Sequence, residues 1–172
     1  ERVEAEGSPI DLDTVTEASV PSAGHAAARS AEELVESVGF RITGRGVKLR
    51  KTGVTVSFAA TDRSGGEWLL DVVGPQTSLR GGLSKTDTVW RTLGRAAAIR
   101  QARGATRYVV LTSALPRSSS EGDAALRAAG PAVISDLIDY TDVADVARLA
   151  QYAAGDSAIT AGFWSSADLG DA

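Results

Sequence analysis

Between residues 40 and 73, apolar and polar residues alternate along several short segments of the chain. A period of two is typical of β-strands with one buried face. Four such segments cover residues 40–43, 47–51, 54–60 and 68–73. Gly44, Gly46 and the polar run at residues 62–66 supply turns between them. We therefore predict a strand meander in which the last two segments form an antiparallel hairpin.

Helical patterns lie on both sides of this meander. One runs from about residue 23 to Gly39 and the other from about residue 86 to Gly104, and glycine is common just past a helix end. Ser84, Thr86 or Asp87 is expected to cap the start of the second helix. The meander is thus enclosed in sequence by two helices.

The second half of the chain combines more compact apolar runs with shorter helices. Residues 108–112 form an apolar segment of the kind found in buried parallel strands, and residues 132–138 are predicted to be another strand. Short helices are expected at residues 123–129 and from about residue 141 to about Tyr152, the second capped by Thr141. The order of helix, strand meander, helix, strand, helix, strand and helix predicts an α/β domain whose mixed sheet is flanked by helices.

The two ends of the chain differ from this central region. Residues 1–20 are acidic and aperiodic and are expected to form a linker or arm, whereas residues 21–154 are expected to form the folded domain. Residues 155–172 are a small, polar tail apart from Phe163 and Trp164. That aromatic pair either covers a groove of the domain or serves as a hook for a partner.

The residue types that are absent exclude several kinds of chemistry. The 172 residues include no cysteine and one histidine, His25, which excludes disulfides, zinc–thiolate sites and multi-histidine metal sites. No serine lies in the Gly-x-Ser-x-Gly pattern of α/β-hydrolases. No apolar run approaches the roughly 18 residues of a membrane helix, so we expect a cytoplasmic protein without membrane contact.

The net charge of −4 hides a strongly basic middle region. Residues 40–107 contain 13 Lys and Arg against four acids, a balance of +9, while the rest of the chain holds five Arg against 18 acids. Such asymmetry is typical of a region that faces a polyanion, and nucleic acid is the polyanion we expect. The alternative is that these cations only cover a solvated sheet and helix.

Several candidate nucleic-acid contacts lie in and before the second long helix. Arg80 and Lys85, with nearby glycines and hydroxyl groups, stand just ahead of a helix N-terminus, which can hold a phosphate. The alternative for this segment is a flexible connection to a capped helix. Arg91 and Arg95 are four residues apart on one helix face and are expected to follow a phosphate backbone. Trp90 is expected to lie in the core, with base stacking as the alternative.

From about residue 21 to residue 116, the order of elements resembles the restriction-endonuclease fold of the PD-(D/E)XK nuclease superfamily. The core of that fold has the order α-β-β-β-α-β. Here a first helix ending in Gly39-Phe40 is followed by a hairpin, a crossover helix and a buried strand. The resemblance implies a DNA endonuclease that hydrolyses phosphodiester bonds with Mg²⁺ or Mn²⁺. In that family, strand carboxylates hold the metal as hard oxygen ligands and a lysine orients the attacking water.

The residues at the motif positions of this superfamily match in part. Asp71 stands at the acidic position of the third core strand, whereas Val73 replaces the lysine and Ser57 replaces the first aspartate. Because family members recruit these groups from neighbouring elements, the resemblance implies a rearranged site. Its expected residues are Asp71 and Asp62 for the metal, and Asp71, Lys85 and Glu36 for catalysis.

The apolar neighbours of Asp71 leave its role open. Leu69 and Val73 share its strand face, and a buried carboxylate without a partner costs several kcal/mol. We therefore expect either a metal ion or an arginine beside Asp71. Two functions follow from these alternatives. One is a metal-dependent nuclease, and the other is a catalytically inactive module of the same fold that binds DNA or a protein partner, in a homodimer or larger assembly.

Overall fold

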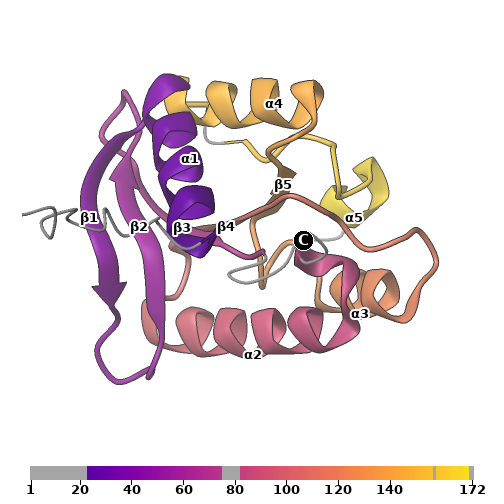
Figure 1. Ribbon diagram of the computed structural model, residues 1–172. Helices are drawn as coiled ribbons and strands as arrows, with labels where there is room; N and C mark the ends of the chain where they lie inside the picture. Colours follow the sequence, from indigo (N-terminus) through magenta and orange to yellow (C-terminus); the bar gives the residue numbers. More distant parts are fainter. Residues whose placement is uncertain (1–22, 75–81, 157, 171–172) are drawn as a thin grey trace, which may run out of the picture.

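A five-stranded mixed sheet forms the centre of the molecule, in the strand order β1-β2-β3-β4-β5 (Figure 1). The computed structural model describes residues 23–74, 82–156 and 158–170. The strands are β1 (Arg41–Lys48), β2 (Thr55–Thr61), β3 (Glu67–Val72), β4 (Arg107–Thr112) and β5 (Asp136–Asp139). Strands β1 to β3 are antiparallel, and β4 and β5 run parallel to β3. The α/β class with a mixed sheet, expected from the sequence, is confirmed.

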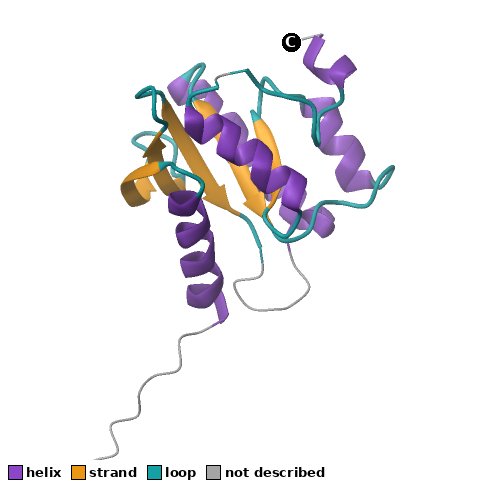
Figure 2. Ribbon diagram, turned by 90° about the horizontal axis from the view of Figure 1, so that it is seen from above, coloured by secondary structure: helices purple, strands orange, loops and turns teal. Residues whose placement is uncertain are grey.

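Helices cover both faces of this sheet. Their bounds are α1 (Ala23–Ser37), η1 (Gly82–Ser84), α2 (Thr86–Arg103), α3 (Glu121–Ala129), α4 (Val143–Ala154) and α5 (Ser166–Gly170). Helices α1 and α4 pack on one face and α2 and α3 on the other, and Figure 1 shows α4 above the strands and α2 below them. Figure 2 is seen from above and looks onto the face that α4 covers.

The central strands supply side chains to two apolar layers. Successive residues of a strand point to opposite faces, so Leu70 and Val109 pack toward α1 and α4 while Leu69 and Val110 pack toward α2 and α3. Trp164 is fully buried in the layer between the sheet and helices α2 and α3. The core therefore draws on the tail after residue 154, and the aromatic pair of the tail docks on the domain.

The first strand differs from its prediction. We expected two short strands separated by a turn at Gly44 and Gly46, and this was wrong because β1 is continuous. The pairing with β2 shifts register between Ile42 and Gly44, which marks a bulge. A Cβ on Gly44 would lie 2.8 Å from the Val47 side chain, and Gly46 has a positive φ of 55°. Both glycines therefore serve an irregular edge strand rather than a turn.

The ends of three elements also depart from the predictions. The N-cap of α2 is Lys85, which makes no side-chain capping bond, so the expected cap from Ser84, Thr86 or Asp87 was wrong. Helix α4 is capped by Asp142, whose Oδ1 accepts hydrogen bonds from two backbone N–H groups, and not by Thr141. Strand β5 is shorter than predicted. None of the described helices is long and apolar enough to cross a membrane.

Candidate functional site

Asp71 lies near the end of β3, on the face that α2 covers, and is only 3% exposed. Its Oδ1 accepts hydrogen bonds from the backbone N–H and the hydroxyl of Ser57, at 3.2 and 3.1 Å. Its Oδ2 accepts from the Tyr108 hydroxyl at 3.1 Å and from Nη2 and Nε of Arg95 at 2.5 and 3.2 Å. Both carboxylate oxygens are therefore occupied by donors of the protein itself.

Arg95 reaches this carboxylate from the middle of α2. Burial lowers the pKa of Arg95, but the hydrogen bonds and negative charge of Asp71 outweigh this effect and raise it. Burial beside the same carboxylate raises the pKa of the Tyr108 hydroxyl, which stays protonated and donates. The cluster is thus a charged pair of arginine and aspartate with a neutral tyrosine. Of the two partners expected for Asp71, the structure shows the arginine.

The residues around Asp71 do not fit a Mg²⁺ or Mn²⁺ ion. A hard cation needs several oxygen ligands, yet the group closest to Asp71 is the positively charged guanidinium of Arg95. Across residues 23–74, 82–156 and 158–170, no group of three or more His, Cys, Asp or Glu side chains could hold a metal ion.

Asp62 lies at the other end of β3, in the turn that precedes it. Its Oδ1 accepts from the backbone N–H groups of Ser64 and Gly66, each at 2.8 Å, and its Oδ2 accepts from Trp68 Nε1 at 2.8 Å. Trp68 belongs to the apolar layer under α1 and α4, whereas Asp71 faces α2. The structure therefore does not bring these two carboxylates together.

The other expected catalytic residues also lie apart from Asp71. Glu36 is exposed on α1 and pairs with Arg45 of β1 at 3.2 Å. Lys85 is exposed at the start of α2, ten residues before Arg95, which corresponds to about 15 Å along a helix. Arg80 lies outside the described residues.

Most of the described cations in the basic middle region have no acidic partner among the described residues. Twelve of the 13 are described, and three of these twelve form ion pairs: Arg45, Arg95 and Arg107. The other nine have no ion pair among the described residues. They are Arg41, Lys48, Arg50, Lys51, Arg63, Lys85, Arg91, Arg100 and Arg103. The two arginines expected to contact a phosphate backbone therefore differ. Arg95 is held by Asp71, whereas Arg91 is exposed and has no ion pair with any residue that the structure describes.

Four of these cations lie on the side of the molecule where Arg95 of α2 contacts the β1–β2 hairpin. Lys48, Arg50 and Lys51 are exposed at the tip. Arg95 Nη2 donates to the Thr55 carbonyl at the base of the hairpin, at 2.7 Å, and Arg91 lies one helical turn before Arg95. Figure 1 shows the hairpin tip at the height of α2, below strands β3 and β4. We call Lys48, Arg50, Lys51 and Arg91 the basic edge.

The hairpin tip is a well-anchored part of the basic edge. Leu49 and Val54, on either side of the tip, are buried in the apolar layer that includes α2. The Thr52 hydroxyl donates to the Leu49 carbonyl at 2.8 Å and accepts from the Val54 N–H at 2.9 Å. Lys51 adopts a positive φ of 65° within this turn. These contacts tie the backbone that carries the cations to the apolar layer below it.

Trp90 is 54% exposed on α2, and the expectation that it lies in the core was wrong. The buried stripe of α2 consists of Val89, Thr92, Ala96 and Ile99. At 100° per residue, Trp90 falls outside that stripe. The polar Thr92 and the small Ala96 hide the stripe in the sequence.

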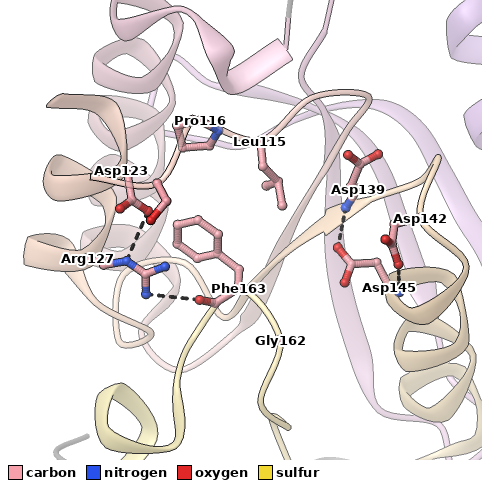
Figure 3. A pocket seen from close by; sticks show the side chains of 10 residues that line it. Leu115, Pro116, Asp123, Arg127, Asp139, Asp142, Asp145, Gly162 and Phe163 are labelled. Carbon is pink, nitrogen blue, oxygen red and sulfur yellow. Dashed lines mark hydrogen bonds and ion pairs between the residues drawn. The ribbon is translucent and has the colours of Figure 1, made fainter. Parts of the chain in front are cut away.

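Sequence reasoning missed a pocket of about 290 Å³ at the carboxyl ends of β4 and β5 (Figure 3). Its lining residues are Leu115, Pro116, Ser118, Asp123, Arg127, Asp139, Asp142, Asp145, Gly162 and Phe163. Figure 3 shows the Phe163 ring between the Asp123–Arg127 pair and the acids at the start of α4. The carboxyl ends of parallel strands are a common place for pockets, and this rule could have indicated it.

The carboxylates of this pocket are already engaged within the protein. Asp123 accepts from Arg127 Nε at 3.1 Å, and Asp145 accepts from the Asp139 N–H at 2.8 Å. Asp142 caps α4. A pocket with four aspartates and one arginine repels phosphate, so it does not extend the basic edge.

No protein-family model, no curated protein and no solved structure matches this chain.

Proposed function

We propose that this chain is a nucleic-acid-binding domain with a restriction-endonuclease-like core and without a catalytic metal site. The observation that carries the proposal is the basic edge, in which Lys48, Arg50, Lys51 and Arg91 are exposed without an acidic partner among the described residues. Unpaired cations on an ordered surface release counterions from nucleic acid when they contact its phosphates.

The order of elements supports the restriction-endonuclease-like part of the proposal. One helix, three antiparallel strands, a crossover helix and a strand parallel to the third follow one another from α1 to β4. This is the α-β-β-β-α-β order of the superfamily core. The hallmark position on β3 carries Asp71, as expected of that core.

The partners of Asp71 support a module that binds without cutting. A catalytic carboxylate must present oxygens to a metal, but those of Asp71 accept from Ser57, Arg95 and Tyr108. Removing Arg95 from this site would leave a buried negative charge, which is costly. Asp71 therefore acts in the proposed module as the acceptor that fixes α2 against β3.

A salt titration of DNA binding tests the proposal. Affinity for a labelled 20-nucleotide DNA should fall steeply between about 50 and about 200 mM salt. Replacing Arg50, Lys51 or Arg91 by glutamine should each reduce the slope of log affinity against log salt by about 1. The matched control is Arg117→Gln, because Arg117 is an exposed arginine far from the basic edge in sequence and has no ion pair among the described residues.

Two outcomes would contradict the proposal. Absence of salt-dependent binding to both DNA and RNA would remove the nucleic-acid function. Cleavage of DNA by the wild-type protein with Mg²⁺ or Mn²⁺, lost in Asp71→Asn, would restore the metal-dependent nuclease in place of the inactive module.

A further inference from the structure

We infer that Trp90 is a stacking platform for an unpaired base, so that the domain prefers single-stranded to double-stranded nucleic acid. The inference rests on the proposed nucleic-acid function and names the substrate class. Its starting observation is a contrast among the three tryptophans: Trp68 and Trp164 are 1% and 0% exposed, whereas Trp90 is 54% exposed.

The surroundings of Trp90 leave its ring accessible. The next residues on the same stripe of α2 are Gly94 and Ala97, at i+4 and i+7. A Cβ placed on Gly94 would meet no atom within 4 Å, so no described side chain covers α2 one turn after Trp90. Exposing a large apolar ring to water is unfavourable, and a flat apolar partner would remove that cost.

The charges around Trp90 indicate what this partner is. Arg91 follows it on the flank of α2 that faces the hairpin, and the rest of the basic edge lies on that side. Asp87 is exposed in the first turn of α2 and repels phosphate. A polyanion backbone is thus favoured along the Arg91 flank and disfavoured over Asp87. Because Trp90 directly precedes Arg91, we expect a base attached to such a backbone to reach the indole.

This geometry separates single strands from duplexes. Every base has an aromatic face that can stack on an indole when it is unpaired, whereas the bases of a duplex already stack on each other inside the helix. Trp90 should therefore strengthen single-strand binding alone, while Arg91 contacts phosphates of either form. No Mg²⁺ and no covalent step is involved.

Binding of a 20-nucleotide oligo(dT) and of a 20-base-pair duplex, each measured by fluorescence anisotropy, tests the inference. Trp90→Ala should weaken oligo(dT) binding by about 5- to 100-fold and change duplex binding by less than about 2-fold. The salt slope should stay the same, because no cation is lost. Val143→Ala is the matched control, since Val143 is 85% exposed on α4, on the opposite face of the sheet.

Intrinsic fluorescence supplies a second readout. Because the other two tryptophans are buried, oligo(dT) should quench the wild-type emission, and this quenching should be lost in Trp90→Ala while Arg91→Gln keeps it at saturation. Alanine is a good helix former at an exposed site, so the variant should fold normally.

Three outcomes would overturn the inference. Salt-dependent binding that is equal for oligo(dT) and duplex and unaffected by Trp90→Ala would refute base stacking and leave the proposed function intact. Absence of binding to every probe would refute both. A dimer in sedimentation without nucleic acid, lost in Trp90→Ala, would assign the exposed indole to contact with a second copy of the chain.

Discussion

Two buried aspartates of the sheet, one in β3 and one in β5, have partners of the same kinds but differ in exposure. Each accepts hydrogen bonds from an arginine on the helix that packs over it and from a tyrosine hydroxyl. The partners are Arg95 and Tyr108 for Asp71, and Arg148 and Tyr152 for Asp136. The side chains of Asp136 and Arg148 are 0% and 7% exposed, against 5% and 31% for Asp71 and Arg95.

The pair in β5 is sealed in the interior. Arg148 also donates to Asp145 at 2.7 Å and to the Leu137 carbonyl at 3.2 Å. A Cβ on Gly162 would overlap the guanidinium, so this tail residue covers the pair closely. Burial opposes the charge of Arg148, but its two carboxylate partners outweigh burial and raise its pKa. Burial raises the pKa of the Tyr152 hydroxyl to about 12, so it remains a donor.

The difference bears on how a strand aspartate is interpreted. The proposed resemblance implies a metal ligand at Asp71 and none at Asp136, yet the two aspartates have partners of the same kinds. The same solution, an arginine from the covering helix, satisfies both carboxylates. The position of an acid in a strand is therefore weaker evidence for catalysis than the groups that its oxygens accept.

The largest effect is expected when the sealed pair is broken. Arg148→Ala leaves the Asp136 charge without its cation in the interior, and should lower the free energy of unfolding by about 3–5 kcal/mol. Urea unfolding at neutral pH, followed by far-ultraviolet circular dichroism, measures this loss. A loss below about 1 kcal/mol would mean that the pair contributes little and that the contrast between the two sites is false.

Breaking the more open pair should cost less. Arg95→Ala should lower the free energy of unfolding by about 1–2 kcal/mol, because Asp71 keeps the donors of Ser57 and Tyr108 and water can enter the space left. The same urea experiment gives this value beside that for Arg148→Ala. Equal losses in the two variants would show that the exposure of Arg95 does not matter.

The same variant also separates the roles of the two α2 arginines. Since Arg95 is held by Asp71, Arg95→Ala should leave the salt slope of DNA binding unchanged, in contrast to Arg91→Gln. A reduced slope for Arg95→Ala would place Arg95 on the phosphate backbone, as the sequence spacing alone suggested.

The parts of the fold that could be predicted from the sequence are those with regular local patterns. The alternation over residues 54–60 and 68–73, the apolar run at 108–112 and the helix at 86–103 depend on neighbours along the chain, and all four are confirmed. Gly44 and Gly46 were misleading because glycine suits a bulged edge strand as well as a turn.

The site was harder to predict because its contacts are not local. Asp71 and Arg95 are 24 residues apart, and only the packing of α2 on β3 brings them together. The need for a partner could be predicted from the burial of Asp71, but its identity could not. Whether Trp90 is buried depends on which face of α2 meets the sheet. That face includes the polar Thr92 and the small Ala96, which give only a weak apolar pattern in the sequence.

Asp62 is a third buried carboxylate, and it differs from the other two because most of its hydrogen-bond partners are N–H groups. Arg107 is its cation, at 3.7 Å, farther than the arginines of the other two sites. Burial raises the pKa of Asp62, but the hydrogen bonds from Trp68, Gly66 and Ser64, with the charge of Arg107, outweigh burial and lower it. The folded state therefore binds this proton less tightly than the unfolded state does.

The smallest expected effect is a dependence of stability on pH that this lowered pKa produces. The contribution of Asp62 should be fully present above the ordinary aspartate pKa of about 4 and be lost as the pH falls through the lower folded pKa. In Asp62→Asn, the free energy of unfolding should be smaller at neutral pH and fall less steeply in acid. Glu67→Gln, at the exposed start of β3, is the control and should keep the wild-type slope. If Asp62→Asn and wild type lose stability in parallel below about pH 4, the turn does not depend on the charge of Asp62, and hydrogen bonds to a neutral acceptor are sufficient to hold it.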